Sequence, residues 1–206
     1  MRVIVPYTPV NPKSRLASIL RADERRGFAA AMLADVVAAI ENAGFVPEIL
    51  STAPLPDRDF VVHVDERSLS TAVNSILSPP MTIVMADLGL LTPAALDRAI
   101  DTEAALVIGP GRGGGTNLLV VRADDFVVDY HGNSLNDHRQ MAAAADIDWI
   151  EVDSFRIATD IDEPSDLVEV LLHGRGRAPT WLREHGIGLS ATDGRVTVDR
   201  ASSPTD

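Results

Sequence analysis

Runs of apolar, β-branched residues alternate along this chain with stretches in which apolar residues recur at helical spacing. This alternation is typical of βαβ units built around a mostly parallel sheet. The apolar runs predict strands at residues 2–6, 46–51, 60–64, 81–86, 104–109, 118–122 and 149–153. Helical spacing predicts helices at residues 24–43, 68–77, 93–100, 136–145 and 164–173. We therefore expect an α/β fold: a single three-layer domain with a mixed, mostly parallel sheet.

Residues suited to begin and end helices support these boundaries. Gly44 follows the longest predicted helix, where a glycine commonly ends a helix in the left-handed conformation. Thr92 and Pro93 supply an N-cap and a first-turn residue for the helix after the fourth strand. The predicted helices thus have local start and stop signals as well as periodicity.

The end of the chain differs from this alternation. We expect a main domain at residues 1–174 and a C-terminal appendage at residues 175–206. Within the appendage we expect a short helix around Pro179–His185 and a β-hairpin that turns at Asp193 and Gly194, a pair typical of type I′ turns.

Composition narrows the possible chemistry. The chain has 206 residues, of which 46% are apolar and 23% charged, as expected for one globular domain. It contains no cysteine, which excludes disulfides, thiolate zinc sites and cysteine nucleophiles. The net charge of -12 argues against binding to nucleic acid or to an anionic membrane. Because the first residues lack the apolar core of a signal peptide, we expect a cytoplasmic protein.

The loop after the first predicted strand is locally basic. It spans Pro6 to Leu16, at the carboxyl end of the sheet, where open α/β folds bind ligands. Such a segment, in a chain of net charge -12, is what an anionic substrate needs; the alternative is an ordinary solvated loop. Between Lys13 and Arg26, a stretch that runs from this loop into the predicted helix, five cations stand against only Asp23 and Glu24, namely Lys13, Arg15, Arg21, Arg25 and Arg26. Lys13 is the one lysine in the sequence, and a compact ammonium suits contact with a phosphate.

Carboxylates occur at two further points of interest. Asp87 ends an otherwise apolar strand, where it could hold Mg²⁺ against a triphosphate or serve as a turn residue. Asp160 and Asp162 alternate along an extended segment, so both could face one metal ion. The alternative is that they cap the helix that follows.

A glycine-rich loop covers residues 109–117. Its glycines let backbone amides approach an anion, and Arg112 and Thr116 add side-chain donors. The loop matches neither a Walker loop nor a dinucleotide-binding fingerprint, because a strand follows it. The alternative is a flexible connection.

Ser134 lies near the start of the helix predicted at residues 136–145, and His138 lies one turn into that helix. Both could contact an anion at the helix N-terminus. A lone histidine is more often structural, and the five histidines show no zinc or Ser-His-Asp spacing.

Taken together, five motifs resemble the 2-phospho-L-lactate guanylyltransferase family of coenzyme F-420 biosynthesis, which has a nucleotide-diphospho-sugar transferase-like fold. The resemblance runs from about residue 1 to 173. The motifs, in chain order, are KSRL, ADLxLL, GGGTN, NSxxxH and DIDEPSDL.

The resemblance implies a reaction in which GTP and 2-phospho-L-lactate give guanosine diphosphate-linked lactate and pyrophosphate, with Mg²⁺. Related members use phosphoenolpyruvate or phosphoglycerate. By their places in these motifs, Lys13 and Arg15 are implied to contact the GTP phosphates and Asp87 to hold the metal, and these three are the implied catalytic residues. Asp160 and Asp162 are implied to bind the same metal. The implied substrate- and nucleotide-binding residues are Pro6, Ser14, Arg112, Gly115, Thr116, Asn117, Ser134 and His138, with Thr116, Ser134 and His138 lining the phospho-acid site. We further expect a homodimer.

Two positions depart from the family pattern. The usual ADLPLL reads ADLGLL here, with Gly89 in place of proline, which leaves the Asp87 carboxylate in place. The usual Leu-Asn reads Leu69-Ser70, which removes an expected contact of asparagine with the nucleotide. Two alternatives remain: another nucleotidyltransferase or glycosyltransferase of the same fold, and a non-catalytic nucleotide-binding regulatory domain.

Overall fold

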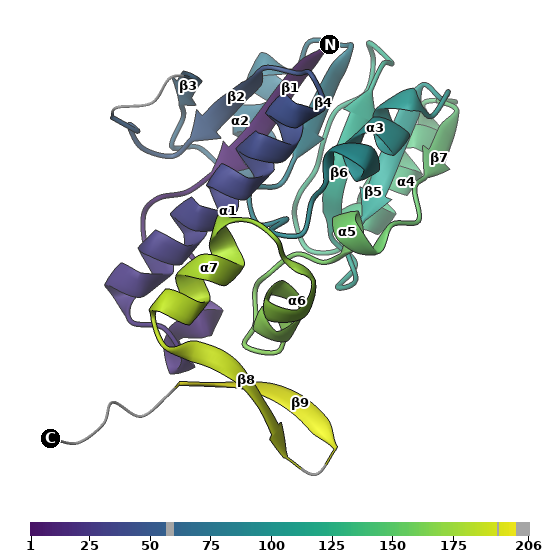
Figure 1. Cartoon of the computed structure of the whole chain (residues 1–206). Coiled ribbons are helices and arrows are strands. Elements are labelled where there is room, and N and C mark those ends of the chain that lie inside the picture. The colour runs from purple at the N-terminus through teal and green to yellow at the C-terminus, as the bar shows by residue number, and fades with distance from the viewer. Residues whose placement is uncertain (57–59, 193, 201–206) are drawn as a thin grey trace, which may run out of the picture.

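The computed structural model describes residues 1–56, 60–192 and 194–200. Its centre is a seven-stranded sheet in the order β3-β2-β1-β4-β6-β5-β7 (Figure 1). The strands are β1 (Arg2–Tyr7), β2 (Pro47–Ser51), β3 (Val61–Val64), β4 (Met81–Val84), β5 (Leu106–Pro110), β6 (Thr116–Val121) and β7 (Trp149–Glu151). The helices are η1 (Ser14–Ser18), α1 (Ala22–Asn42), α2 (Leu69–Ile76), α3 (Pro93–Asp101), α4 (Ser134–Ala144), α5 (Phe155–Ala158), α6 (Asp166–His173) and α7 (Arg177–Glu184). A hairpin of β8 (Ile187–Thr192) and β9 (Arg195–Arg200) follows.

Strand β6 runs against the others. It pairs antiparallel with β4 and with β5, whereas the remaining pairs in the sheet are parallel. Val84, the last residue of β4, pairs with Leu118, and Pro110, the last residue of β5, pairs with Thr116. The start of β6 therefore lies at the rim formed by the carboxyl ends of the parallel strands.

Helices cover both faces of the sheet. Alternate residues of each strand point to opposite faces, so Val3 and Val5 belong to one buried cluster and Ile4 to the other. In Figure 1, α1, α3 and α5 lie in front of the sheet, and α2 and α4 lie behind it. Strands buried on both faces read as continuous apolar runs, which is why the central strands were predictable. The expected three-layer α/β domain is confirmed.

The C-terminal segment packs on α1. Helix α7 lies alongside α1 in Figure 1, and the rings of Trp181 and Phe28 have centroids 5.7 Å apart. Leu182 and Ile187 are fully buried in a third apolar cluster together with Phe28. Asp35, within α1, accepts hydrogen bonds from the first two backbone amides of α7 at 2.6 and 2.8 Å. The division between residues 1–174 and 175–206 stays a prediction.

The predicted elements are present, with shifted boundaries. Strand β4 ends at Val84, earlier than expected, because the chain turns there toward Asp87. Strand β6 begins at Thr116 and α4 at Ser134, each two residues earlier than expected. The helices η1 and α5 were not predicted, since four or five residues are too few to show periodicity. The predicted turn at Asp193 and the end of the appendage, 201–206, lie outside the described residues.

Candidate active site

The loop after β1 carries Lys13 in a fixed backbone conformation. Lys13 has φ 53° and ψ 46°, in the left-handed region, and its carbonyl accepts a hydrogen bond from Leu16 N at 3.0 Å. Arg25, a buried residue of α1, donates from Nε to the Pro12 carbonyl at 3.2 Å and from Nη2 to Asn11 Oδ1 at 2.9 Å. Helix α1 thus holds the loop, and the fully buried Leu16 anchors the turn that follows Lys13.

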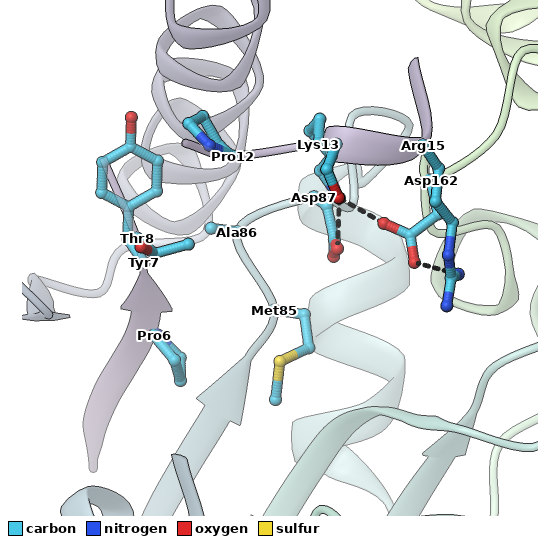
Figure 2. A pocket seen from close by; sticks show the side chains of 11 residues that line it. Pro6, Tyr7, Thr8, Pro12, Lys13, Arg15, Met85, Ala86, Asp87 and Asp162 are labelled. Carbon is cyan, nitrogen blue, oxygen red and sulfur yellow. Dashed lines mark hydrogen bonds and ion pairs between the residues drawn. The ribbon is translucent and has the colours of Figure 1, made fainter. Parts of the chain in front are cut away.

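Lys13 bridges two carboxylates from distant parts of the chain. Its Nζ donates to Asp87 Oδ2 and to Asp162 Oδ1, each at 2.7 Å (Figure 2). The Lys13 side chain is only 11% exposed. Burial alone would lower the pKa of Lys13, but the charges of Asp87 and Asp162 raise the pKa above its usual value. Arg15 contacts the second oxygen of Asp162 at 3.3 Å and is 68% exposed. Lys13 is therefore a mostly buried cation paired with two carboxylates, and Arg15 is an exposed one paired with a single carboxylate.

The turn after β4 presents Asp87 to this cluster. Met85 N donates to the Asn117 carbonyl at 3.0 Å, and Ile161 N donates to the Asp87 carbonyl at 3.3 Å, so the turn is tied on two sides. Asp87 Oδ1 is buried and has no hydrogen-bond partner among the described residues. A buried carboxylate oxygen without a donor is costly, and a cation would satisfy it. Asp87 is thus more than a turn residue.

Asp160 lies close to the same carboxylates. Asn117 Nδ2 donates to Asp160 Oδ1 at 3.1 Å. Burial raises the pKa of Asp160. The hydrogen bond from Asn117 lowers this pKa, and the charges of Asp87 and Asp162 raise it, so that the net shift is upward. Asp160 therefore lies near Asp87 and Asp162, but among the described residues no three such side chains are placed to hold one metal ion. The metal site predicted for Asp160 and Asp162 stays a prediction. The alternative of helix capping is not what they do: the N-cap of α6 is Ser165, and Asp166 Oδ2 accepts from the amides at 162 and 163.

A cavity of about 350 Å³ opens beside this cluster. It lies between the carboxyl ends of β1 and β4, the position at which open α/β sheets bind ligands (Figure 2). The lining residues are Pro6, Tyr7, Thr8, Pro12, Lys13, Ser14, Arg15, Met85, Ala86, Asp87 and Asp162. The predicted residues Pro6, Ser14, Lys13, Arg15, Asp87 and Asp162 thus meet at one cavity.

Thr116, Ser134 and His138 form a second, fully internal cluster. Thr116 N donates to Ser134 Oγ at 3.0 Å, and Thr116 Oγ1 lies 2.9 Å from His138 Nδ1. His138 Nε2 accepts from Asp129 N at 3.0 Å, so the proton of the neutral ring is on Nδ1 and points to Thr116. Burial lowers the pKa of His138 to about 4, which keeps the ring neutral. All three side chains are buried, so they join β6 to α4, and their predicted contact with the phospho-acid remains a prediction.

The glycine-rich loop is a hydrogen-bonded turn. Gly111 N donates to the Gly115 carbonyl at 2.8 Å, and Gly114 N donates to the Gly111 carbonyl at 3.1 Å. Arg112 N donates to the Ala158 carbonyl, and the Arg112 guanidinium pairs with Asp166 at 3.0 Å. A Cβ atom on Gly111 would lie 2.7 Å from the Asn117 side-chain oxygen, which requires glycine there. The loop is therefore no flexible connection; it fixes Asn117 beside Asp160.

Some residues of the site were not singled out from the sequence. Arg25 was counted only as one of several loop cations, although its place in the first turn of α1 faces the loop. Asp166 had no assigned role, although it lies within the DIDEPSDL motif. Ser70, in place of the family's asparagine, accepts from Tyr130 N at 2.9 Å.

The fold has close structural neighbours. A protein from Desulfovibrio desulfuricans G20, described as a nucleotide-diphospho-sugar transferase, superposes with a TM-score of 0.74 at 14% identity, over 90% of this chain and 96% of that one. The protein therefore has the nucleotide-diphospho-sugar transferase-like fold.

Sequence relatives narrow this class. The chain is 57% identical to the 2-phospho-L-lactate guanylyltransferase of Natronomonas pharaonis, over 97% of this chain and 99% of the relative. It is 52% identical to the enzyme of the same name from Halomicrobium mukohataei, over 97% of this chain and 100% of the relative. A family model described as guanylyl transferase CofC like matches residues 1–201, and the chain belongs to that family of nucleotidyltransferases.

Proposed function

We propose that this protein transfers GMP from GTP to 2-phospho-L-lactate and releases pyrophosphate, a step of coenzyme F-420 biosynthesis. The relatives that bear this activity in their names match nearly the whole chain. The observation that carries the proposal is the ion-paired cluster of Lys13, Asp87 and Asp162 beside a cavity at the carboxyl rim of the sheet. Such a cluster supplies a cation for phosphate and carboxylates for a metal at one place.

The carboxylates fit Mg²⁺. Asp87 Oδ1 is a buried oxygen without a donor among the described residues, and oxygen ligands are those that Mg²⁺ prefers. In the part of the chain that the structure describes, no three acidic or histidine side chains are placed so that they could hold a metal ion by themselves. Mg²⁺ usually takes most of its ligands from substrate phosphates and water, so one or two of the carboxylates of Asp87, Asp160 and Asp162 would suffice. The ion would supply charge neutralisation for the triphosphate.

The chain's own residues would position and neutralise the phosphates. A phosphate oxygen of the acceptor forms a bond to the α-phosphorus of GTP, the bond from that phosphorus to the bridging oxygen breaks, and pyrophosphate leaves. Lys13 and Arg15 would contact the triphosphate, since transfer of this kind depends mainly on positioning and electrostatic stabilisation. The acceptor phosphate is already nucleophilic, so no general base is assigned.

The partners that we propose are small molecules, GTP and the phospho-acid, and a second copy of the chain in a homodimer. Across the described residues, no helix is both long and apolar enough to cross a membrane. The net charge of -12 disfavours nucleic acid and anionic lipid surfaces. A cytoplasmic location is part of the same proposal.

A pyrophosphate-release assay tests the proposed function. Each of the four common nucleoside triphosphates would be paired with 2-phospho-L-lactate, phosphoenolpyruvate and phosphoglycerate, with and without Mg²⁺. We expect release with GTP and 2-phospho-L-lactate in the presence of Mg²⁺. Turnover with a different nucleotide and acceptor would favour another transferase of this fold, and GTP binding without turnover would favour a regulatory domain.

A further inference from the structure

Lys13 neutralises the same carboxylates that the proposed function assigns to Mg²⁺. Its Nζ lies 2.7 Å from an oxygen of Asp87 and 2.7 Å from an oxygen of Asp162. At these distances the ammonium occupies the space between the two carboxylates, as Figure 2 shows. A divalent ion shared by Asp87 and Asp162 would therefore lie next to a positive charge.

A divalent cation and the Lys13 ammonium would repel each other in this space. Coulomb repulsion between a divalent ion and an ammonium a few ångströms apart is strong in a partly buried site, where water screens little. Asp160 adds a third negative charge nearby, and Arg15 adds a positive charge on the outer oxygen of Asp162. The metal would bind well only if the Lys13 ammonium moved to another anion.

The backbone around Lys13 favours motion of the side chain alone. The Lys13 carbonyl is bonded to Leu16 N, and the fully buried Leu16 anchors the turn. Arg25 holds the preceding carbonyl. The ammonium can therefore swing on its four-carbon stem, from the carboxylates toward the cavity that Lys13 also lines, while the backbone stays in place.

We propose that Lys13 and the divalent cation compete for Asp87 and Asp162, so that the cation binds tightly only together with a nucleotide whose phosphates take up the Lys13 ammonium. This rests on the proposed function, because it requires a metal-bound triphosphate in the cavity. Lys13 then couples the binding of the metal to the binding of the nucleotide. Its ammonium repels a metal ion that arrives alone, and it binds the phosphates when the metal arrives with a nucleotide.

The first test uses Mn²⁺ as a paramagnetic substitute for Mg²⁺, with free Mn²⁺ measured by electron paramagnetic resonance and no nucleotide present. Lys13→Met keeps the length of the side chain and removes the charge, and we expect it to bind Mn²⁺ at least tenfold more tightly than the wild type. The matched control is Arg15→Met, which removes the exposed cation from the same carboxylate. We expect that control to change the affinity by less than Lys13→Met does. Equal affinities of Lys13→Met and the wild type would overturn the proposal.

The second test uses the wild-type protein and does not depend on the folding of a variant. Because Lys13 is the sole lysine, ε-¹⁵N-lysine labelling gives one side-chain nitrogen signal in an NMR spectrum. We expect this signal to shift when Mg²⁺ and the α,β-methylene analogue of GTP are added together, and to stay in place with millimolar Mg²⁺ alone. A signal that Mg²⁺ alone displaces, or that the complex leaves unchanged, contradicts the exchange.

The two proposals can fail separately. If no acceptor in the grid releases pyrophosphate, the proposed reaction is wrong, whereas the Mn²⁺ and NMR measurements can still show the exchange. If pyrophosphate is released but Lys13→Met binds Mn²⁺ no better than the wild type, the exchange is wrong and the guanylyl transfer stands.

Discussion

Asp87 has two carboxylate oxygens in different surroundings. Oδ2 accepts from Lys13, and Oδ1 is buried without a donor among the described residues. The first oxygen fixes the orientation of the group, and the second is left without a donor among the described residues, which suits the cation that we propose there. This asymmetry makes Asp87 the most informative residue to substitute.

Asp87→Asn is expected to lower the rate of guanylyl transfer by roughly a hundredfold or more, the usual effect of removing one charge-stabilising group. Initial rates of pyrophosphate release at saturating GTP measure the effect. Asp101→Asn, at the exposed end of α3, removes one negative charge far from the cavity and serves as the control. An equal loss of rate in both variants would mean that net charge, and not this carboxylate, matters.

His138 gives the protein a predictable dependence on acid. Its folded pKa of about 4 lies below the ordinary value of 6.5, because the ring is fully buried. Between these values the unfolded chain binds a proton that the folded chain does not, so the free energy of unfolding falls as the pH drops from about 6.5 to about 4. The loss from this one group is about 3 kcal/mol, at about 1.4 kcal/mol per tenfold difference in proton affinity.

Urea unfolding of the wild type and of His138→Gln over this pH range checks the expectation. The variant should be less stable near neutral pH by about 1–3 kcal/mol, because buried partners of the ring lose a hydrogen bond, and its stability should change less with pH. Gln140→Ala, at an exposed position of the same helix, provides a control and should keep the wild-type pH dependence. The interpretation fails if the His138 variant shows the same pH dependence as the wild type.

At the scale of elements, Asp35 links two helices. It lies within α1, yet its carboxylate accepts from Arg177 N and Ala178 N at the start of α7. A Cβ atom on Gly176 would collide with this carboxylate, so a glycine is required where the two helices meet. The charge that interrupts an apolar helix in the sequence is therefore the cap of another helix.

Asp35→Ala should destabilise the protein by about 1–2 kcal/mol, the usual cost of losing an N-terminal helix cap, and α7 should detach more readily. Limited proteolysis of the 174–186 region, together with urea unfolding, measures both effects. Glu41→Ala, on the exposed side of α1, is the matched control and should change little. Unchanged proteolysis in Asp35→Ala would show that apolar packing alone holds α7.

The sequence predicted the strands and long helices because their signals are local. Val3, Ile4 and Val5 are all fully buried, as a continuous apolar run between two helical layers requires. The direction of β6 left no such signal, since an antiparallel strand buried on both faces has the same apolar pattern as a parallel one. The helix α5 was missed for lack of length.

For the site, the sequence predicted which residues gather but not how they pair. Lys13 and Asp87 stand out in the sequence because they follow predicted strands, and Asp162 because it alternates with Asp160 along an extended segment. Their mutual ion pairs join positions 74 to 149 residues apart, and no local pattern reports on such pairs. Likewise, the burial of His138 depends on Phe126 and Tyr130, which lie on a loop of irregular structure.

At the scale of the whole molecule, the C-terminal segment contributes to the core. Leu182 and Ile187 are fully buried in a cluster with Phe28, in the first half of α1, and Arg200 pairs with the buried Glu24 at 2.7 Å. Arg200 lowers the pKa of Glu24 to about 2. The segment therefore contributes both apolar burial and an ion pair to the main domain.

A chain that ends at residue 174 should be less stable than the full chain by roughly 3–6 kcal/mol, from the burial of Leu182 and Ile187 alone. Urea unfolding followed by circular dichroism measures the difference. Leu182→Ala should reproduce part of it, about 2–4 kcal/mol, whereas Leu189→Ala, on the exposed hairpin, should have little effect. A shortened chain that unfolds at the same urea concentration as the full chain would establish residues 1–174 as an independent domain.

The reversed direction of β6 also determines where the protein can tolerate insertions. Thr116 and Asn117 begin this strand at the rim. If one residue added to the turn before them shifts the strand by one position, each of the two side chains faces the opposite side of the sheet. The connection between α3 and β5 lies at the opposite end of the sheet, remote from the cavity. We therefore expect insertions to be tolerated in the connection between α3 and β5, and a peptide tag inserted there should leave catalysis intact.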